Sequence, residues 1–217
     1  MTRRGTILWP RCIVAVVDSS RTAAERPRRG RPPIPEHRAA ILEATRELLA
    51  EGGYAGLTFE AVAARAGLYR RYINRTWTSK AELVRDAALS DIPSFAVPDT
   101  GDFVSDIEAY VGLYVDLNLR PEVLWGLPSL QVELINDAAL LEDTFERFVA
   151  PAVDALRTVL DRGVASKVLV EAPDAELLMS VLAGSIQQLA LRGVLDREAL
   201  VDYMTQLLCH GLLRVEA

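Results

Sequence analysis

A short segment of the chain gathers side chains that can bind phosphates and the edges of bases. Residues 69–75 read YRRYINR and contain three arginines, two tyrosines and one asparagine. Guanidinium and hydroxyl groups bind phosphates, and guanidinium and amide groups also pair with guanine and adenine edges. If the segment is helical with Ile73 facing inward, Arg71 and Arg75 lie almost opposite it. The predicted DNA-binding residues of this segment are Tyr69, Arg70, Arg71, Tyr72, Asn74 and Arg75.

A helix-turn-helix is the element that would present this surface. Thr58 can cap a helix over residues 59–66, and Gly67 can take the left-handed backbone conformation that reverses the chain. Ala63 is small enough for a second helix to cross closely over the first. The apolar anchors on the inner face of that second helix are Leu68, Ile73 and Trp77. Such a motif places its second helix in the major groove of DNA. The alternative is that the arginines form only a solvated helix face.

Two residues beside this segment offer further phosphate contacts. Ser79 can cap a helix that runs to about Leu89, and Glu82 completes a capping box. Lys80 lies in the first turn of that helix, where the helix dipole favours a bound phosphate. Thr58 offers its hydroxyl group together with the amides that it caps. We therefore add Thr58 and Lys80 to the predicted DNA contacts.

Charge is distributed unevenly along the chain. The net charge is −6, yet the first 90 residues carry 16 Lys and Arg against 9 Asp and Glu. A polyanion would therefore meet the N-terminal part and be repelled by the acidic remainder. Residues 1–35 are predicted to form a disordered or extended basic tail. Its Arg28, Arg29 and Arg31 either enter an adjacent minor groove or only keep the tail soluble.

The composition excludes several other classes of protein. Cys12 and Cys209 are the only cysteines, so no disulfide framework or cysteine-based metal cluster is predicted. His37 and His210 lack metal-ligand spacing, and no phosphate-binding glycine loop or nucleophile motif is present. We therefore predict neither an enzyme nor a cofactor. The longest uncharged stretch, residues 177–191, is too short to span a membrane, so a soluble, cytoplasmic protein is expected.

The remaining apolar periodicity is helical throughout, which predicts an all-α fold. Before the helix-turn-helix, a helix is expected from Glu36 to Ala50, with Gly52-Gly53 as its end. After a loop over 92–101, helices are expected over about 102–119, 137–168, 174–192 and 196–213. Pro151 either kinks the second of these or begins a new helix. Gly126 and Pro128 predict a broken helix over 121–135, with a gate at 121–130.

Two apolar surfaces are predicted in the C-terminal part. The last two helices are suited to pair with a second copy in a four-helix bundle, or else they form a monomer core. An aromatic and aliphatic pool between the two parts of the chain can line a small-molecule pocket, or else it is ordinary core. The candidate pocket residues are Tyr110, Tyr114, Trp125, Leu130, Phe145, Phe148, Met179 and Gln187.

A continuous sequence pattern runs through the N-terminal part: ILEATRELLAEGGYAGLTFEAVAARAG (41–67), then Trp77 and SKAEL (79–83). This pattern resembles the tetracycline-repressor-like (TetR) family of transcriptional regulators. The resemblance implies a DNA-binding domain of three helices over 36–91 and a larger helical ligand-binding and dimerisation domain over 102–217. It also implies a homodimeric repressor that a small, largely apolar effector releases from a palindromic operator in double-stranded DNA.

The second helix of the motif departs from the family pattern. Relatives usually have Ser or Thr at the position of Tyr69, a small residue or Thr at Tyr72, and Tyr at Asn74. Tyr69 cannot cap a helix as Ser does, at a cost of about 1 kcal/mol. The alternative hypothesis is a helical ligand- or protein-binding module whose degenerate helix-turn-helix reads no specific operator.

Overall fold

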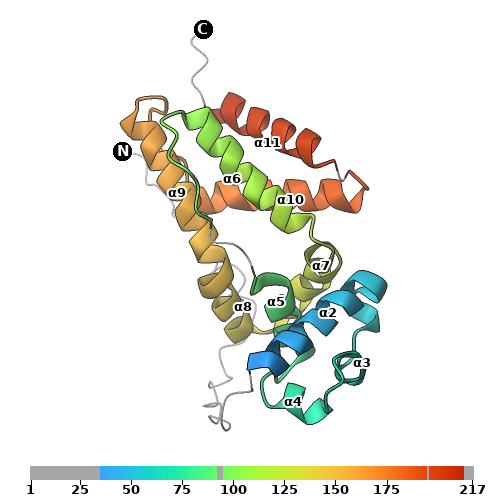
Figure 1. Cartoon of the computed structure of the whole chain (residues 1–217). Coiled ribbons are helices and arrows are strands. Elements are labelled where there is room, and N and C mark those ends of the chain that lie inside the picture. Colours follow the sequence, from blue (N-terminus) through green and yellow to red (C-terminus); the bar gives the residue numbers. More distant parts are fainter. Residues whose placement is uncertain (1–34, 92–94, 195, 213–217) are drawn as a thin grey trace.

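The structure of the protein is a computed structural model that describes residues 35–91, 95–194 and 196–212. Within these ranges the chain forms helices and no strand, which confirms the predicted all-α fold (Figure 1). The predicted basic tail and its arginines lie outside the described residues, apart from Pro35. No helix in the described ranges is both long enough and apolar enough to cross a membrane.

Among the described residues, four helices form the N-terminal part of the fold. They are α2 (Pro35–Gly56), α3 (Phe59–Arg65), α4 (Arg70–Asn74) and α5 (Lys80–Leu89). The C-terminal part contains α6 (Phe103–Asn118), α7 (Pro121–Asn136), α8 (Ala138–Thr144), the π-helical turn η1 (Phe145–Val149), α9 (Ala150–Ala165), α10 (Ala175–Leu191) and α11 (Arg197–Leu212). In Figure 1, α8 and α9 form a long rod that reaches from the C-terminal helices down to α5.

Side-chain caps fix the starts of several helices. The hydroxyl of Thr58 accepts a hydrogen bond from the Ala61 amide at 3.1 Å, and the hydroxyl of Ser79 accepts one from the Glu82 amide at 3.1 Å. Asp102 and Asp174 cap α6 and α10 in the same way. Because these caps depend on neighbouring residues alone, their positions agree with the predicted helix starts.

One predicted helix break is confirmed and another is wrong. The backbone of α2 is non-helical at Gly53, with a left-handed φ of 63°, so the chain kinks there as predicted and one more short turn follows to Gly56. The region 121–135 is a continuous helix, α7, despite Pro128 in its interior. Burial of Leu130 and Leu134 on one side of α7 offsets the lost backbone hydrogen bond. The predicted gate at 121–130 therefore has no helix break to support it.

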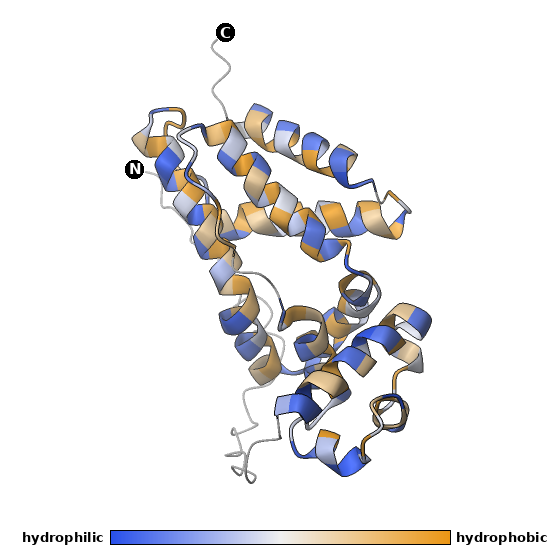
Figure 2. Ribbon diagram, in the orientation of Figure 1, coloured by the Kyte–Doolittle hydropathy of each residue, from blue (hydrophilic) through white to orange (hydrophobic). Residues whose placement is uncertain are grey.

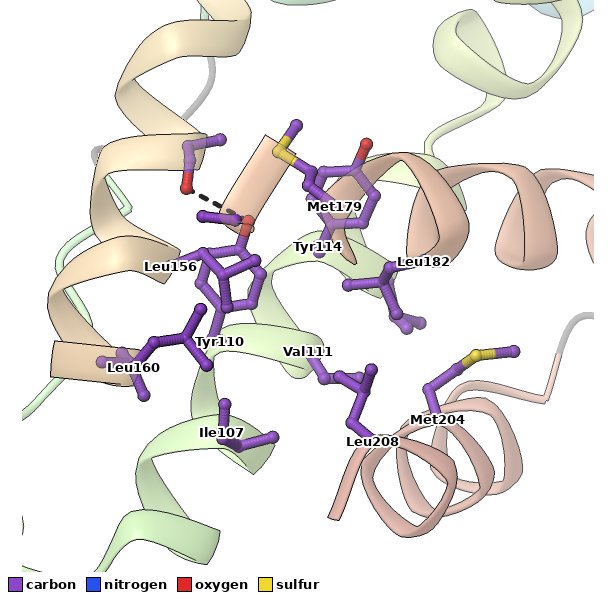
Figure 3. Packing of buried hydrophobic residues seen from close by; sticks show 14 of the residues in the cluster. Ile107, Tyr110, Val111, Tyr114, Leu156, Leu160, Met179, Leu182, Met204 and Leu208 are labelled. Carbon is purple, nitrogen blue, oxygen red and sulfur yellow. Dashed lines mark hydrogen bonds between the residues drawn. The ribbon is translucent and has the colours of Figure 1, made fainter. Parts of the chain in front are cut away.

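The hydrophobic core has two main clusters. One cluster joins α6, α9, α10 and α11. Figure 3 shows Ile107 and Tyr110 of α6 facing Leu156 and Leu160 of α9 in this cluster. The other lies among the N-terminal helices, but Leu130, Leu134 and Leu140 of α7 and α8 complete it. Figure 2 shows hydrophobic residues along the whole length of α10. The N-terminal helices are therefore not packed as an independent unit, since α7 and α8 supply part of their core.

Candidate nucleic-acid interface

The turn between α3 and α4 is closed by a Schellman motif. Gly67 has a φ of 65°, in the left-handed region that glycine favours. The amide of Leu68 donates to the Ala63 carbonyl at 2.9 Å, and the amide of Gly67 donates to the Ala64 carbonyl at 3.3 Å. These bonds satisfy the last carbonyls of α3 and set the direction in which the chain enters α4. The predicted role of Gly67 is confirmed.

Two buried anchors hold α4 against the rest of the protein. Ile73 and Trp77 are both buried, as predicted, and the Trp77 amide donates to the Ile73 carbonyl at 2.9 Å. The indole Nε1 of Trp77 also donates to Oδ2 of Asp86 on α5 at 3.1 Å. Leu68, the third predicted anchor, is half-buried against the same cluster. The orientation of α4 is thus fixed by apolar burial and by one buried hydrogen bond.

The outer face of α4 carries the predicted cationic and aromatic groups. Tyr69, Arg71, Asn74 and Arg75 are exposed, and Tyr72 is half-buried. The guanidinium carbon of Arg71 lies 4.7 Å from the ring centroid of Tyr69 and 5.3 Å from that of Tyr72. These cation–π contacts restrict the Arg71 side chain before any ligand arrives. Tyr69 precedes the helix but its side chain makes no capping hydrogen bond, as its phenol ring predicts.

Arg70 and Thr58 already have partners within the protein. The Arg70 guanidinium forms an exposed ion pair with Glu60 on α3. The hydroxyl of Thr58 is occupied as the cap of α3, although the residue itself is exposed. An arriving phosphate would compete with Glu60 for Arg70. Sequence reasoning missed Glu60, because no local signal relates it to a residue on the next helix.

Lys80 lies in a partly buried site between α2 and α7. Its Nζ is 4.1 Å from the ring centroid of Tyr54, and the Tyr54 hydroxyl donates to Oε1 of Glu133 at 3.3 Å. Burial lowers the pKa of Lys80, and the charge of Glu133 opposes this effect only in part. Burial and the nearby Glu133 raise the pKa of Tyr54 to about 12. A phosphate beside Lys80 would favour its charged form.

A buried ionic chain under the motif was not predicted. Oδ2 of Asp86 accepts hydrogen bonds from Trp77 and from Nη2 of Arg38 at 2.8 Å, while Oδ1 accepts from Nη2 of Arg85 at 2.8 Å. Arg85 then reaches α8, where its Nη1 donates to Oδ2 of Asp143 at 2.5 Å. Asp86 and Arg85 are both buried. The adjacent Arg85 and Asp86, which have apolar residues on both sides in AELVRDAAL (81–89), are the signal that could have revealed it.

The structure brings together only some of the predicted pocket residues. Tyr110, Tyr114 and Met179 share the C-terminal cluster, and the hydroxyl of Tyr110 donates to the Ala152 carbonyl at 3.1 Å. Phe145 and Phe148 lie in η1, where Phe148 packs beside α5 and α7. Leu130 belongs to the N-terminal cluster, Trp125 is exposed, and Gln187 contacts Gln131 at 3.5 Å. The eight residues therefore do not surround one space.

Two known protein families match this chain, one over the helix-turn-helix part and one over the longer helical part. The family described as "Bacterial regulatory proteins, tetR family" matches residues 41–87. The family described as "Tetracyclin repressor-like, C-terminal domain" matches residues 97–212. The chain belongs to the TetR family. It is a helix-turn-helix transcriptional regulator, and the resemblance inferred from residues 41–83 is confirmed.

Individual TetR-family relatives cover most of this chain. The uncharacterized HTH-type transcriptional regulator YdeS of Bacillus subtilis (strain 168) is 30% identical over 73% of this chain and 80% of its own. The DNA-binding transcriptional repressor TetR of Mycobacteroides abscessus is also 30% identical, over 73% of this chain and 84% of its own.

Solved structures share the fold of this TetR-family chain. The TetR family transcription regulator SCO0332 superposes with a TM-score of 0.60 at 26% identity, covering 82% of this chain and 100% of its own. The regulator FadR of Bacillus subtilis, in complex with stearoyl-CoA, superposes with a TM-score of 0.64 at 17% identity, covering 80% and 98%.

Proposed function

We propose that the protein is a homodimeric repressor that binds a palindromic operator through α4 and leaves it when a small, largely apolar effector binds. Residues 36–91 act as the DNA-binding domain, and residues 102–217 bind the effector and form the dimer. The observation that carries the proposal is the outer face of α4. There Arg71 is held between two tyrosine rings on a helix that buried Ile73 and Trp77 anchor.

The chemistry of this face supports both phosphate and base contacts. Arg71 and Arg75 present guanidinium groups that suit phosphates and guanine edges, and Asn74 presents an amide that suits adenine. Thr58, Arg70 and Lys80 flank the face as phosphate contacts. Tyr69 and Tyr72 limit the rotamers of Arg71, which reduces the conformational entropy that binding costs.

The proposed dimer is supported by apolar residues that α10 and α11 leave exposed. On α10, the exposed positions Leu177, Val181, Gly184, Gln188 and Leu191 follow a spacing of four and three residues. This spacing gives one continuous stripe along the helix. On α11, Tyr203 and Leu207 are exposed as well. A second copy of the same surface would bury both stripes in a four-helix bundle.

The proposed effector site is the aromatic cluster of the C-terminal domain. The rings of Tyr110 and Tyr114 are stacked with centroids 6.3 Å apart, and Met179 belongs to the same cluster. Burial raises the pKa of Tyr114 to about 12, which reflects the apolar surroundings of its hydroxyl. FadR, whose fold is similar, is in complex with stearoyl-CoA. We therefore propose acyl chains as the first effectors to test.

DNA binding can be tested by fluorescence anisotropy on the DNA that flanks the gene, across a range of salt concentrations. The double variant Arg71→Ala with Arg75→Ala should lose the preference for operator over random DNA. If both arginines contact phosphates, the slope of log K against log salt should fall by about 2. The matched control is Arg157→Ala with Arg197→Ala, which removes two exposed, ion-paired arginines far from α4. A double variant at 71 and 75 that still discriminates would refute the assigned surface.

A random-oligonucleotide selection with the wild-type protein separates the repressor from a degenerate helix-turn-helix. The repressor should enrich one palindromic sequence. Addition of stearoyl-CoA or a shorter acyl compound should then lower the affinity of the protein for the enriched sequence and release it from the DNA. No enrichment of any sequence would favour the module that reads no operator.

A further inference from the structure

The helix α7 has two apolar faces, and the described residues cover only one of them. On the covered face, Leu130 and Leu134 are buried in the N-terminal cluster. A Cβ atom on Gly126 would lie 3.4 Å from Cγ1 of Val84 and 3.5 Å from Cδ1 of Leu49, so α7 packs closely on α5 and α2. This face is as tightly packed as a protein core.

The other face of α7 exposes large apolar side chains. Trp125 is 51% exposed, Val132 is 60% exposed and Ile135 is 54% exposed. At about 100° per residue these three positions fall within an arc of about 80°, so they form a single stripe. We call Trp125, Val132 and Ile135 the α7 stripe. An exposed apolar stripe of this kind marks an interaction surface more often than isolated surface residues do.

The α7 stripe lies next to the proposed dimer surface on α10. The Gln131 amide nitrogen approaches the Gln187 amide oxygen at 3.5 Å, which joins α7 to α10 beside the exposed Val132 and Gln188. Figure 1 shows α7 close under α10. A partner that covers the α10 stripe would therefore also meet α7.

The charge of this region favours a second copy of the chain as the partner. The α7 stripe and the adjoining Gln131 and Asn136 are uncharged, although the C-terminal part of the chain is strongly acidic. An uncharged strip is where two like-charged acidic domains can approach with least repulsion. The exposed Glu133 on α7 and the excess of Asp and Glu over residues 91–217 would repel DNA and anionic lipid surfaces. A twofold dimer also requires a surface that is compatible with itself, which a neutral apolar strip provides.

We infer that the α7 stripe packs against a second copy of the chain as a third strip of the dimer surface, beside α10 and α11. This inference rests on the proposed homodimer. It gives α7 two roles, because its covered face carries α2 and α5 and its other face meets the partner. The dimer contact then acts directly on the helices that hold α4, and so sets the distance between the two copies of α4.

Three glutamate variants of the full chain test the inference. Val132→Glu places a charge in the α7 stripe, Val181→Glu places one in the α10 stripe, and Val170→Glu is the control. Val170 is 70% exposed and lies outside the helices. Analytical ultracentrifugation should give a dimer dissociation constant raised about tenfold or more for the first two variants. The control should match the wild type, and circular dichroism should show unchanged helix content in all three.

The two proposals fail in distinguishable ways. If Val181→Glu dissociates the dimer and Val132→Glu does not, the α7 inference is overturned and the homodimer stands. If Val181→Glu leaves the dimer intact, the proposed α10 surface is wrong.

Should Val132→Glu lose helix content, acrylamide quenching of Trp125 fluorescence replaces this variant as the test, with Trp125→Phe as the reference. Trp125 should be shielded in the wild-type dimer and accessible in monomeric Val181→Glu. Equal accessibility in the two states, whether both shielded or both open, would overturn the inference.

Discussion

Removing the charge of Asp86 should destabilise the whole N-terminal part of the fold. Asp86 is only 4% exposed, and its carboxylate accepts hydrogen bonds from Arg38, Trp77 and Arg85. Asp86→Asn keeps the shape of the side chain but leaves the two arginines without their shared anion. Breaking a buried ion pair by removing one partner costs about 3–5 kcal/mol.

The structure places the expected cost near the lower end of that range. Arg38 is partly exposed, so water can solvate its guanidinium group after the substitution. Arg85 keeps Asp143 as a partner, although that carboxylate is on the surface. We therefore expect a loss of about 3 kcal/mol in the free energy of unfolding. For a chain of this length, that loss lowers Tm by about 6–12 °C.

Thermal unfolding followed by circular dichroism measures this effect. Asp154→Asn is the matched control, because Asp154 is an exposed carboxylate that pairs with Arg157 on the same helix. Exposed pairs contribute about 0–1 kcal/mol, so the control should change Tm little. An Asp86→Asn variant that loses less than about 1 kcal/mol would refute the claim that this carboxylate holds the motif in place.

The pH dependence gives a second readout of the same group. Burial alone would raise the pKa of Asp86, but the hydrogen bonds from Arg38 and Arg85, the charge of Arg85 and the Trp77 indole together lower it. The unfolded chain has a pKa near 3.9 at this residue. The stabilisation is therefore fully present above about pH 5 and is lost as the pH falls through the lower, folded pKa. Between pH 5 and 3, wild-type stability should fall towards that of Asp86→Asn, so the difference between them should shrink.

Three further substitutions have expected outcomes. Glu60→Gln removes the partner of Arg70 and a carboxylate beside the proposed DNA surface, so DNA affinity at low salt should rise several-fold by anisotropy; unchanged or weaker binding would contradict this. Gly67→Ala should cost about 1 kcal/mol in urea unfolding, because φ is 65° while the space for a Cβ is open; a neutral result would mean that the turn relaxes freely. Gly163→Ala would put a Cβ 2.6 Å from Cε2 of Phe103 and should cost about 1–3 kcal/mol, measured in the same way, whereas a stabilised variant would contradict the close packing.

Local signals made the helix-turn-helix predictable, whereas long-range packing decided the features that were not predicted. Thr58, Gly67 and Ser79 act through hydrogen bonds to residues at most five positions away, so their roles can be inferred from the sequence alone. By contrast, Asp86 pairs with Arg38, which is 48 residues away, and no periodicity encodes that contact. Pro128 predicts a helix break, but the burial of α7 against α2 and α5 outweighs the lost hydrogen bond.

The same long-range contacts determine how the two parts of the molecule can communicate. Arg85 joins Asp86, under α4, to Asp143 on α8, and the ring of Phe148 in η1 lies 5.7 Å from the Arg85 guanidinium carbon. Any displacement of α8 or η1 relative to α5 must therefore break the ion pair between Arg85 and Asp143 or rotate the Arg85 side chain. Breaking the ion pair leaves the buried Arg85 without this partner, whereas moving α5 together with α8 keeps the pair. A C-terminal rearrangement would thus carry α5, and with it the anchor of α4, as one body.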